Sequence, residues 1–454
     1  MKKLHKGIFI AFILVLFMCG HGWCATLWTK DIGGTVYYDA AASSCDDVTA
    51  GDTSSDLEAA HDAAGAAGTV YVCAGTYSTT ELDADGELDI TLANQTWTAV
   101  GTVTLVGTAG RVSPVHITGG APGGGGLTFT GFSITVADDA NNRTGIVNLH
   151  AGVTIDQCTI TGAGVGAGFT GYIGIDSIGT TFTYTNNIIS GLRIGIRSQV
   201  DDVGVALISG NTISDLSVGS SSGADGMLLA DADGDGIGDY SECVVTLNDI
   251  SGYMDDGIDL IRSSGAIIRK NTIHDNGAGA DGQGIKAGGA WGNGNIIDRN
   301  TIYNITSNDG ISTNGGDNGF IRYNLLYNIS GNDGIDQDTS STGWTITNNT
   351  VIMAAGGVHA MDFGGSSTAT LQNNIFDKGA DGTPYDIEAG DGTITGGYNV
   401  LVNDAAPNSA GNYTNTGTSD QGTTDPLFVS ATDFNLKPGS PARNAGTPNG
   451  STPF

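Results

Sequence analysis

A phrase built around asparagine recurs along most of the sequence: an apolar residue, two variable residues, Asn, one variable residue and a second apolar residue. Phe132 and Cys158 take the central place in two upstream copies. The intervals between successive centres from 132 to 399 are 26, 29, 24, 37, 23, 29, 24, 25, 25 and 25 residues. A period near 25 residues predicts one elongated solenoid rather than the three domains that the length suggests. The central asparagines are Asn187, Asn211, Asn248, Asn271, Asn300, Asn324, Asn349, Asn374 and Asn399.

The residues that flank each central Asn are mostly Ile, Val, Thr, Phe and Tyr. Apolar and polar types alternate on both sides of the Asn, which predicts β-strands. The inward positions lie three residues before the Asn and two after it, so the alternation slips by one residue and we expect a tight bend there. With coils about 4.8 Å apart, the asparagines would form an interior file in which the amides bond to one another and to the backbone. We interpret this file as structural.

A second phrase is Asp-Gly followed by an aliphatic residue, as at Asp225, Asp256, Asp309 and Asp333. Relatives without the Asp begin at Gly195, Gly284 and Gly357. Asp-Gly is typical of turns in which Gly takes a left-handed conformation. Each coil is therefore predicted to have at least two strands and two corners of different shape.

The two ends of the chain contain candidate caps. Residues 54–65 have Ser at the start, acidic residues early and Gly at the end, which predicts a short helix. A strand from Thr69 to Cys73 follows, and the helix would cover the open edge of the first coil. The Pro-containing tail at 425–446 could close the other end.

Charge and the N-terminus limit the compartment and the partners. The chain has 17 basic and 48 acidic residues, a formal net charge of −31, which disfavours binding to nucleic acid or an anionic membrane. Residues 1–25 have the layout of a secretory signal peptide, and their apolar run is short for a membrane span. A retained anchor, or lipidation at Cys19 or Cys24, is the alternative. We expect a monomer that is secreted or held at the cell surface, with no membrane span after signal removal.

Four cysteines remain after signal removal: Cys45, Cys73, Cys158 and Cys243. Export to an oxidising compartment makes a disulfide plausible. Cys45 and Cys73 are the natural pair because both lie in the short N-terminal unit.

The longest interval, 37 residues between Asn211 and Asn248, contains a calcium-loop pattern over residues 231–242. Acids stand at positions 1, 3, 5, 9 and 12 and Gly at position 6. Removing twelve residues leaves the coil period of 25, so the loop is predicted to be an insertion at a corner. An acidic surface loop without an ion is the alternative. The predicted calcium ligands are Asp231, Asp233, Asp235, Ile237 (through its carbonyl), Asp239 and Glu242.

The Asn-Thr-Ile and Gly-Ile phrases resemble the repeats of right-handed parallel β-helix proteins of the pectate-lyase-like superfamily. Thr35–Asp39 and Gly68–Tyr77 are similar to the N-terminal cap of its secreted bacterial members, and Asp425–Phe428 with Phe434–Pro441 is similar to the ending of many such surface proteins. The resemblance implies an all-β, single-stranded right-handed parallel β-helix of about eleven coils with a short capping helix. It implies no single activity, because the superfamily contains lyases, hydrolases, epimerases and adhesins. The predicted units are a signal peptide at 1–25, a cap with first strands at 26–100, β-helix repeats at 101–424 and a tail at 425–454.

Residues just after each Gly-aliphatic pair are expected to point outward and to stack coil by coil. In enzymes that this chain resembles, the substrate groove often follows such a stack. A lyase would need a base such as Lys286 or Arg262 beside calcium-holding acids. A hydrolase would need paired carboxylates, for which Asp336 and Asp338, about 7 Å apart along one strand, are the best offer. The stack is Arg197, Leu228, Asp259, Lys286, Ser312, Asp336 and His359, with Gln199, Asn314 and Asp338 two residues further on.

The catalytic candidates are therefore Asp259, Lys286, Asp336 and Asp338, and the alternative is that all four are solvated surface residues. The acidic doublets and the Gly-His-Gly sequence of the hydrolase branch are absent. His116, His150 and His274 are scattered and are expected not to pair with acids at metal spacing.

Three functions remain open at this point. The first is binding or processing of an extracellular polysaccharide, the second a structural or adhesive surface protein, and the third a calcium-dependent lyase or epimerase acting on polyuronates. The third would need calcium to bridge the acidic protein and an acidic substrate.

Overall fold

The computed structural model describes most of the chain between residues 25 and 444, and no helix in that part is long and apolar enough to cross a membrane. Residues 1–24, which hold the predicted signal peptide, lie outside the described part. The described residues are 25–32, 35–50, 52–78, 81–82, 86–107, 113–118, 126–136, 143–162, 172–200, 204–216, 223–231, 238–277, 282–288, 292–337, 341–379, 386–388, 390, 392–402, 412–415, 421–422, 425–430 and 432–444.

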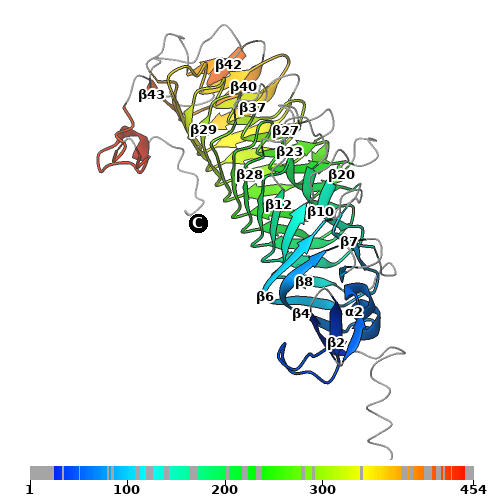
Figure 1. Cartoon of the computed structure of the whole chain (residues 1–454). Helices are drawn as coiled ribbons and strands as arrows, with labels where there is room; N and C mark the ends of the chain where they lie inside the picture. Colours follow the sequence, from blue (N-terminus) through cyan, green and yellow to red (C-terminus); the bar gives the residue numbers. More distant parts are fainter. Residues whose placement is uncertain are drawn as a thin grey trace, which may run out of the picture.

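The chain winds into a parallel β-helix whose coils stack along one axis (Figure 1). Each coil contributes one strand to a 12-stranded sheet and two strands to a 29-stranded sheet. The all-β fold class predicted from the repeat is confirmed, and the 12 stacked strands agree with about eleven coils. The strands of the 12-stranded sheet are β5 (Leu88–Ile90), β7 (Val115–Ile117), β10 (Arg143–Asn148), β13 (Tyr172–Ser177), β16 (Ile194–Gln199), β19 (Met227–Ala230), β23 (Ile258–Ile261), β27 (Ile285–Gly288), β30 (Ile311–Ser312), β33 (Ile335–Gln337), β36 (Met361–Phe363) and β39 (Ile387–Glu388).

The large sheet holds two parallel files of strands, one before and one after each central Asn. The first file is β8 (Thr128–Thr130), β11 (Val153–Asp156), β14 (Phe182–Thr185), β17 (Ala206–Ser209), β21 (Cys243–Thr246), β25 (Ile267–Arg269), β28 (Ile296–Asp298), β31 (Phe320–Arg322), β34 (Trp344–Thr347), β37 (Thr368–Gln372), β40 (Thr393–Gly397) and β42 (Asn412–Asn415). The second is β9 (Ser133–Val136), β12 (Thr159–Gly162), β15 (Ile188–Ser190), β18 (Thr212–Ser214), β22 (Asp249–Ser251), β26 (Thr272–His274), β29 (Thr301–Ile305), β32 (Leu325–Ile329), β35 (Thr350–Met353), β38 (Ile375–Asp377), β41 (Val400–Leu401) and β43 (Gln421–Gly422).

The asparagine corners have the geometry that the repeat predicts. The residue before every central position has positive φ, as in Lys270 (φ 56°) before Asn271. The main-chain N–H and the side-chain Nδ2 of Asn271 both donate to Oδ1 of Asn300 at 3.0 Å, and Nδ2 also donates to Val245 O. The same pattern joins successive asparagines from Asn187 to Asn399, all of them buried. The predicted interior file is confirmed.

The Asp-Gly corners do not have the predicted geometry. Gly257 and Gly310 take no left-handed conformation. A Cβ at Gly257 would lie 2.5 Å from Gly284 O, and one at Gly310 would lie 2.6 Å from Gly334 O. Glycine is needed here because the backbones of neighbouring coils approach closely, not because of a turn.

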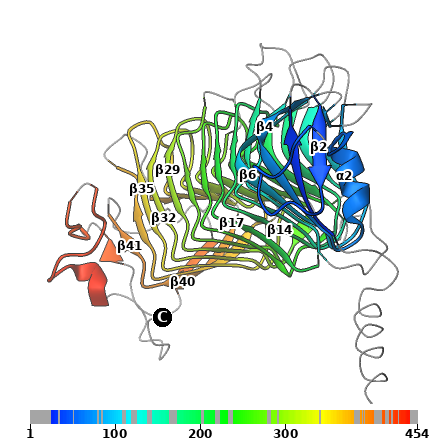
Figure 2. The ribbon, with the colours of Figure 1, turned by 60° about the horizontal axis from the view of Figure 1, so that its bottom comes forward.

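The N-terminal cap is built from the predicted helix, three strands and a disulfide. The helix α2 (Leu57–Ala64) begins later than predicted because Asp56, not Ser, is its N-cap, and Gly65 (φ 69°) ends it. It lies beside the first coils (Figure 2). The strands β1 (Thr26–Asp31), β2 (Val36–Asp39) and β3 (Thr53–Ser55) lead into β4 (Thr69–Ser78) and β6 (Thr96–Val106), which pairs with β8 and β9.

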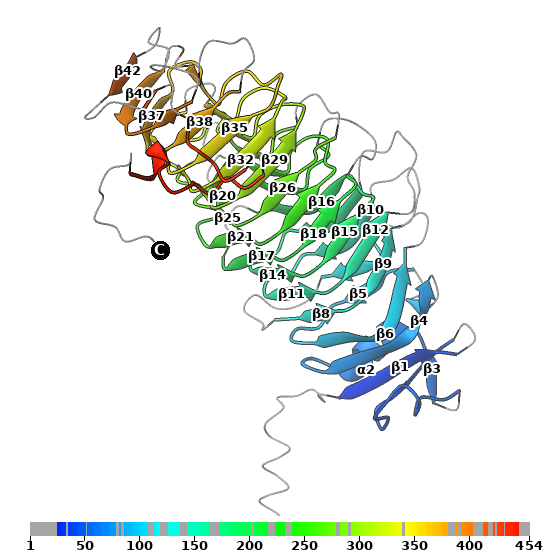
Figure 3. The same ribbon diagram turned by 90° about the vertical axis from the view of Figure 1, so that its left-hand side faces the viewer.

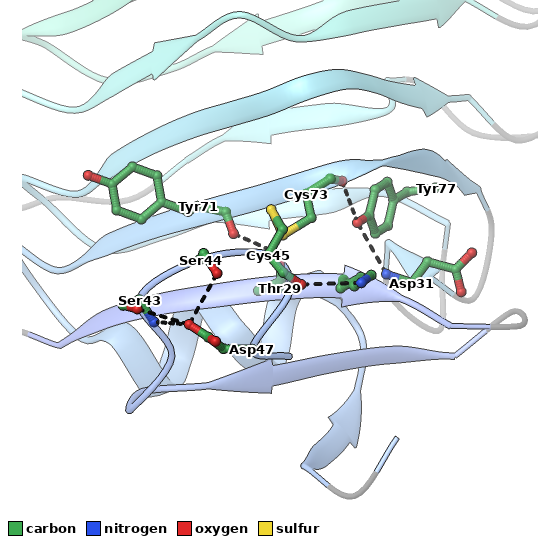
Figure 4. The surroundings of a disulfide bond; sticks show 10 residues. Thr29, Asp31, Ser43, Ser44, Cys45, Asp47, Tyr71, Cys73 and Tyr77 are labelled. Atoms are coloured by element: carbon green, nitrogen blue, oxygen red, sulfur yellow. Dashed lines mark hydrogen bonds between the residues drawn. A yellow bond between two sulfur atoms is a disulfide. The ribbon is translucent and has the colours of Figure 1, made fainter. Parts of the chain in front are cut away.

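Cys45 and Cys73 form the predicted disulfide, which ties the β2–β3 connection to β4 (Figure 4). Beside it, Tyr77 Oη donates to Cys73 O at 2.8 Å and accepts from Asp31 N at 3.3 Å. The free cysteines Cys158 and Cys243 are buried.

The described part of the C-terminal segment lies against the side of the solenoid (Figure 3). Phe434 contacts the ring of Tyr327 on β32, with 5.0 Å between ring centroids. Phe434 contacts the side of the solenoid well before its end, because the second file continues past β32 with β35, β38, β41 and β43. The ring of Tyr327 also stacks on Tyr303, and Tyr303 stacks on His274.

Candidate functional site

One file of outward positions runs along the 12-stranded sheet, and the strand register fixes its members. The predicted stack is confirmed from Arg197 to Asp336. It extends further in both directions than the sequence suggested. The whole file is Asp89, His116, Val147, Asp176, Arg197, Leu228, Asp259, Lys286, Ser312, Asp336, Asp362 and Glu388.

The predicted place of His359 in this file is wrong, because Asp336 pairs with Asp362 instead. The Gly357-Val358 pair follows a turn at Ala355-Gly356 and precedes β36, so it is not the repeat. Gly334 N donates to His359 O at 2.9 Å, just as Gly310 N donates to Asp333 O. His359 therefore occupies the position that Asp holds in the preceding coils.

The outward face of the 12-stranded sheet contains several buried charged residues. Asp259 is 5 % exposed and Asp336 is 9 % exposed although both point away from the solenoid interior. The first file of the large sheet has half-buried threonines at 154, 183, 345 and 370 and also the buried Asp298, which forms ion pairs with Arg299 and Arg322. Buried carboxylates without such a pair of arginines distinguish the 12-stranded sheet.

Four aspartates surround Lys286 in what we call the lysine cluster: Asp225, Asp255, Asp256, Asp259 and Lys286. Lys286 Nζ donates to Asp256 Oδ2 at 3.2 Å, and the Asp256 side chain is fully buried. One ligand atom from each of Asp225, Asp255 and Asp256 lies within 4.8 Å of the other two. These three carboxylates suit a hard divalent cation, which prefers oxygen ligands.

Burial and mutual repulsion change the acidity of this cluster. Burial, with the charges of Asp259 and Asp255, raises the pKa of Asp225 to about 8. Burial also raises the pKa of Asp256 and of Asp259. For Lys286 burial lowers the pKa, but the carboxylates of Asp256 and Asp259 outweigh it and hold this pKa above its usual range. Lys286 is therefore a protonated amine whose proton is held by the acids around it.

Two buried oxygens at the lysine cluster lack a hydrogen-bond partner among the described residues. They are Oδ1 of Asp259 and the hydroxyl of Tyr253, whose pKa is raised by burial and by the charge of Asp256. Buried polar atoms in folded proteins are nearly always paired. Unpaired oxygens beside three convergent carboxylates therefore point to a ligand or an ordered water at this place.

A second group, the histidine cluster of Asp333, His359 and Asp362, lies further along the same face. One ligand atom from each residue lies within 4.8 Å of the others. His359 Nδ1 lies 3.1 Å from Asp333 Oδ1, which also accepts from the main-chain N–H of His359 at 2.8 Å. The sequence did not single out Asp362, and it showed Asp333 only as a turn residue.

The other catalytic candidates are placed as follows. Asp336 neighbours Ser312 in the outward file, with 3.5 Å from Ser312 Oγ to Asp336 Oδ2. Asp338 lies outside the described residues, so the proposed carboxylate pair has no measured separation. The signal that could have revealed Asp225 and Asp256 was the recurrence of Asp at one position of successive coils.

The predicted calcium loop lies at the corner between β19 and β21, and the file of asparagines continues past it. Residues 232–237, with Asp233, Asp235 and Ile237, lie outside the described part. The flanks of the loop are fixed: β20 (Gly238–Asp239) pairs with β24 (Ser263–Ser264), and Tyr240 Oη donates to Ala230 O at 2.8 Å. The two ends of the loop lie close together: an added Cβ at Gly238 would be 3.1 Å from the Cβ of Asp231.

The expectation that the scattered histidines avoid acids is wrong for two of them. His116 Nδ1 lies 3.2 Å from Asp89 Oδ1, and Glu87 completes a half-exposed group with ligand atoms within 4.8 Å. His274 contacts Asp249 and Asp275 at 2.9 and 2.7 Å. The partners come from other coils or the next residue, so sequence spacing does not reveal most of them.

The family model that describes a right-handed β-helix region matches residues 121–376, more than half of the chain. The protein belongs to the right-handed β-helix family. No curated protein matches.

Solved structures with a similar fold include enzymes that act on sugars. A periplasmic alginate epimerase is 14 % identical with a TM-score of 0.47, covering 73 % of this chain and 77 % of the epimerase. An alginate lyase in complex with a trisaccharide is 16 % identical with a TM-score of 0.48, covering 75 % and 81 %. A protein in complex with xylose is 13 % identical with a TM-score of 0.47, covering 84 % and 85 %. These likenesses concern the fold and assign no substrate to this chain.

Proposed function

We propose that this right-handed β-helix protein is exported and processes an acidic extracellular polysaccharide on the outward face of its 12-stranded sheet. The observation that carries the proposal is the lysine cluster, where a lysine and several buried carboxylates converge on an outward face. Buried charges lower stability unless they are paired or ligated. A solenoid that served only as a spacer would gain nothing from several buried carboxylates that share one lysine.

The reaction that fits these groups is abstraction of a proton next to the carboxylate of a uronic acid. A cation held by Asp225, Asp255 and Asp256 would supply positive charge toward an acidic substrate. Lys286 is the group that exchanges the proton, because its amine lies within 3.2 Å of Asp256 at the outward surface. As the acids are neutralised, their hold on the Lys286 proton weakens and the free amine can act as a base.

Proton abstraction has two outcomes with different products. When Lys286 removes the C5 proton and the C4 oxygen leaves with a proton from water, the chain is cleaved and an unsaturated sugar remains. When the C4 bond stays intact and water donates a proton to C5 from the opposite face, the sugar is epimerised without cleavage. A glycoside hydrolase is the second candidate, because burial raises the pKa of Asp259 to about 6, toward the range of a general acid.

We also propose that calcium binds the loop at 231–242. The paired flanks and the closeness of Asp231 to Gly238 support it, because ends that are already held together lower the cost of bringing carboxylates together. Its role is structural, since it lies at a corner and outside the outward file of the 12-stranded sheet.

The test is a panel of pectin, alginate, chondroitin and a neutral glycan, with calcium and with chelator. Absorbance at about 235 nm detects the unsaturated product of a lyase, and new reducing ends detect any cleavage. Proton exchange into the sugar from deuterated water detects epimerisation. The proposal predicts one of these signals on an acidic glycan, lost with chelator. No product from any glycan would leave the structural or adhesive alternative.

A further inference from the structure

We propose that Asp333, His359 and Asp362 form a second metal site, which binds a divalent transition-metal ion such as Zn²⁺ through an imidazole nitrogen and carboxylate oxygens. It is distinct from the lysine cluster and from the loop at 231–242. On the outward file, Asp362 lies three strands beyond Lys286, about 14 Å away at the usual strand spacing.

The fold brings the three ligands together from two successive coils. Asp333 and His359 occupy equivalent corner positions of neighbouring coils, as the equivalent main-chain bonds show. Asp362 follows His359 on β36 and points to the same outward face. One ligand atom from each residue lies within 4.8 Å of the other two, so small side-chain movements would let the three share one ion.

Each ligand has an atom left over for the metal. Asp333 Oδ1 takes the contacts with His359, and no described residue bonds its second oxygen, although the side chain is only 4 % exposed. Nδ1 of His359 lies 3.1 Å from Asp333 Oδ1, which is close to the separation of two ligand atoms on one ion. With the imidazole proton on Nε2, the lone pair of Nδ1 is available to the metal.

The charge around this cluster is unbalanced. The charged groups that act on His359 are Asp333, Asp362 and Glu388. Burial, with neighbouring acids, raises the pKa of Asp309 to about 7 and that of Asp362 to about 6. Among the described residues, no Lys or Arg forms an ion pair with Asp309, Asp333 or Asp362.

The lysine cluster provides the contrast, because Lys286 supplies a positive charge there. Among the described residues, the ion pair at the histidine cluster is formed by His359 when it is protonated. Buried carboxylates are normally paired or bound to a metal. A divalent ion would take the place of that proton and would balance the acids more fully.

The imidazole determines which metal fits. Calcium takes oxygen ligands, whereas zinc accepts imidazole nitrogen together with carboxylate. We therefore expect the histidine cluster to select Zn²⁺ over Ca²⁺, in contrast to the oxygen-only groups elsewhere on the chain.

Calorimetric titration of the metal-free mature protein with Zn²⁺, in excess Ca²⁺ to fill the oxygen-only groups, tests the inference. We expect saturable Zn²⁺ binding that His359→Gln and Asp362→Asn each weaken by about tenfold or more. The matched control is His116→Gln, since His116 also contacts an aspartate in a three-residue group on the same face. It should leave the tight site unchanged. Co²⁺ should give a visible absorption band that His359→Gln removes.

Two further results would test whether the histidine cluster binds Zn²⁺. Affinity for Zn²⁺ should fall as pH is lowered, because protons compete for His359 and Asp362. Zn²⁺ should raise the Tm of the wild type and of His116→Gln but not of His359→Gln, with the Tm without metal showing that each variant is folded. Millimolar binding only, equal binding by His359→Gln, or loss of binding in His116→Gln alone would overturn the site. No substrate is used, so failure here leaves the proposed function untouched.

Discussion

The side-chain oxygen of Asn248 accepts both the main-chain N–H and the Nδ2 of Asn211 at 2.9 Å, although 37 residues separate the two. The intervals on either side of this step are 24 and 23 residues. The extra residues are inserted at a corner, and the hydrogen bonds of the asparagine file continue across the insertion. The insertion therefore does not interrupt the β-helix.

Asn248→Ala should destabilise the solenoid by about 3 kcal/mol, because two buried donors of Asn211 lose their acceptor and Ile208 O loses a donor. Urea unfolding followed by circular dichroism measures the loss. Asn186→Gly is the control, since Asn186 is exposed and glycine keeps its positive φ. Equal destabilisation by both variants would show that the file contributes little.

Replacing both cysteines of the Cys45–Cys73 pair by serine should destabilise the N-terminal cap by about 3–4 kcal/mol. The disulfide closes a loop with a sequence separation of 28, and loop-closure entropy of that size is expected for such a loop. Thermal unfolding and limited proteolysis near the N-terminus would report the change. If reduction of the wild type alters neither, the bond does not stabilise the cap.

Calcium should raise the Tm of the mature protein and chelator should lower it, because an ion that binds only the folded loop stabilises by about 2.7 kcal/mol at one hundred times its Kd. Asp231→Ala combined with Asp233→Ala should remove the part of the effect that comes from the loop. Calorimetry gives the affinity directly. Unchanged calcium binding in the double variant would contradict the loop assignment.

The stability of the metal-free protein should fall as pH rises through the folded-state pKa of Asp225, about 8. This pKa is raised above its usual value of 3.8, so the stabilisation is complete below about pH 4 and lost as Asp225 ionises. Asp225→Asn cannot ionise, and at pH 9 it should exceed the wild type by more than about 1 kcal/mol. Denaturant midpoints at pH 5, 7 and 9 measure the difference. A difference that is constant with pH would contradict the buried carboxyl.

The β-helix could be predicted because each coil repeats the same short sequence pattern. Nine asparagines at a near-constant period specify the bend, and positive φ at the residue before each follows from the same slip in alternation. The reason for glycine at position 257 is not visible in the local sequence, because a Cβ there would collide with the carbonyl of Gly284 in the next coil. A close approach between coils has no signature in the local sequence around one glycine.

The candidate site was predicted only in outline. The outward file containing Asp259 and Lys286 follows from strand alternation and the repeat. The burial of Asp256 and the pairing of His359 with Asp333 depend on what covers the face and on which residues align between coils. Gly357-Val358 resembles the Gly-aliphatic phrase but lies three residues before Ala360-Met361, the pair that aligns with the other coils. The sequence pattern therefore points to His359 in the outward file instead of Asp362.

The rate of product formation by Lys286→Gln, on whichever acidic glycan the wild type processes, tests the central claim most directly. The matched control is Arg269→Gln, which removes one positive charge from an exposed position on the large sheet. We predict that Lys286→Gln, at a temperature where circular dichroism shows it to be folded, lowers kcat at least about 100-fold, while Arg269→Gln retains the wild-type rate. The Tm of Lys286→Gln should fall, because the buried Asp256 loses its partner. Equal rates for Lys286→Gln and the wild type would show that the lysine cluster is not where this protein acts.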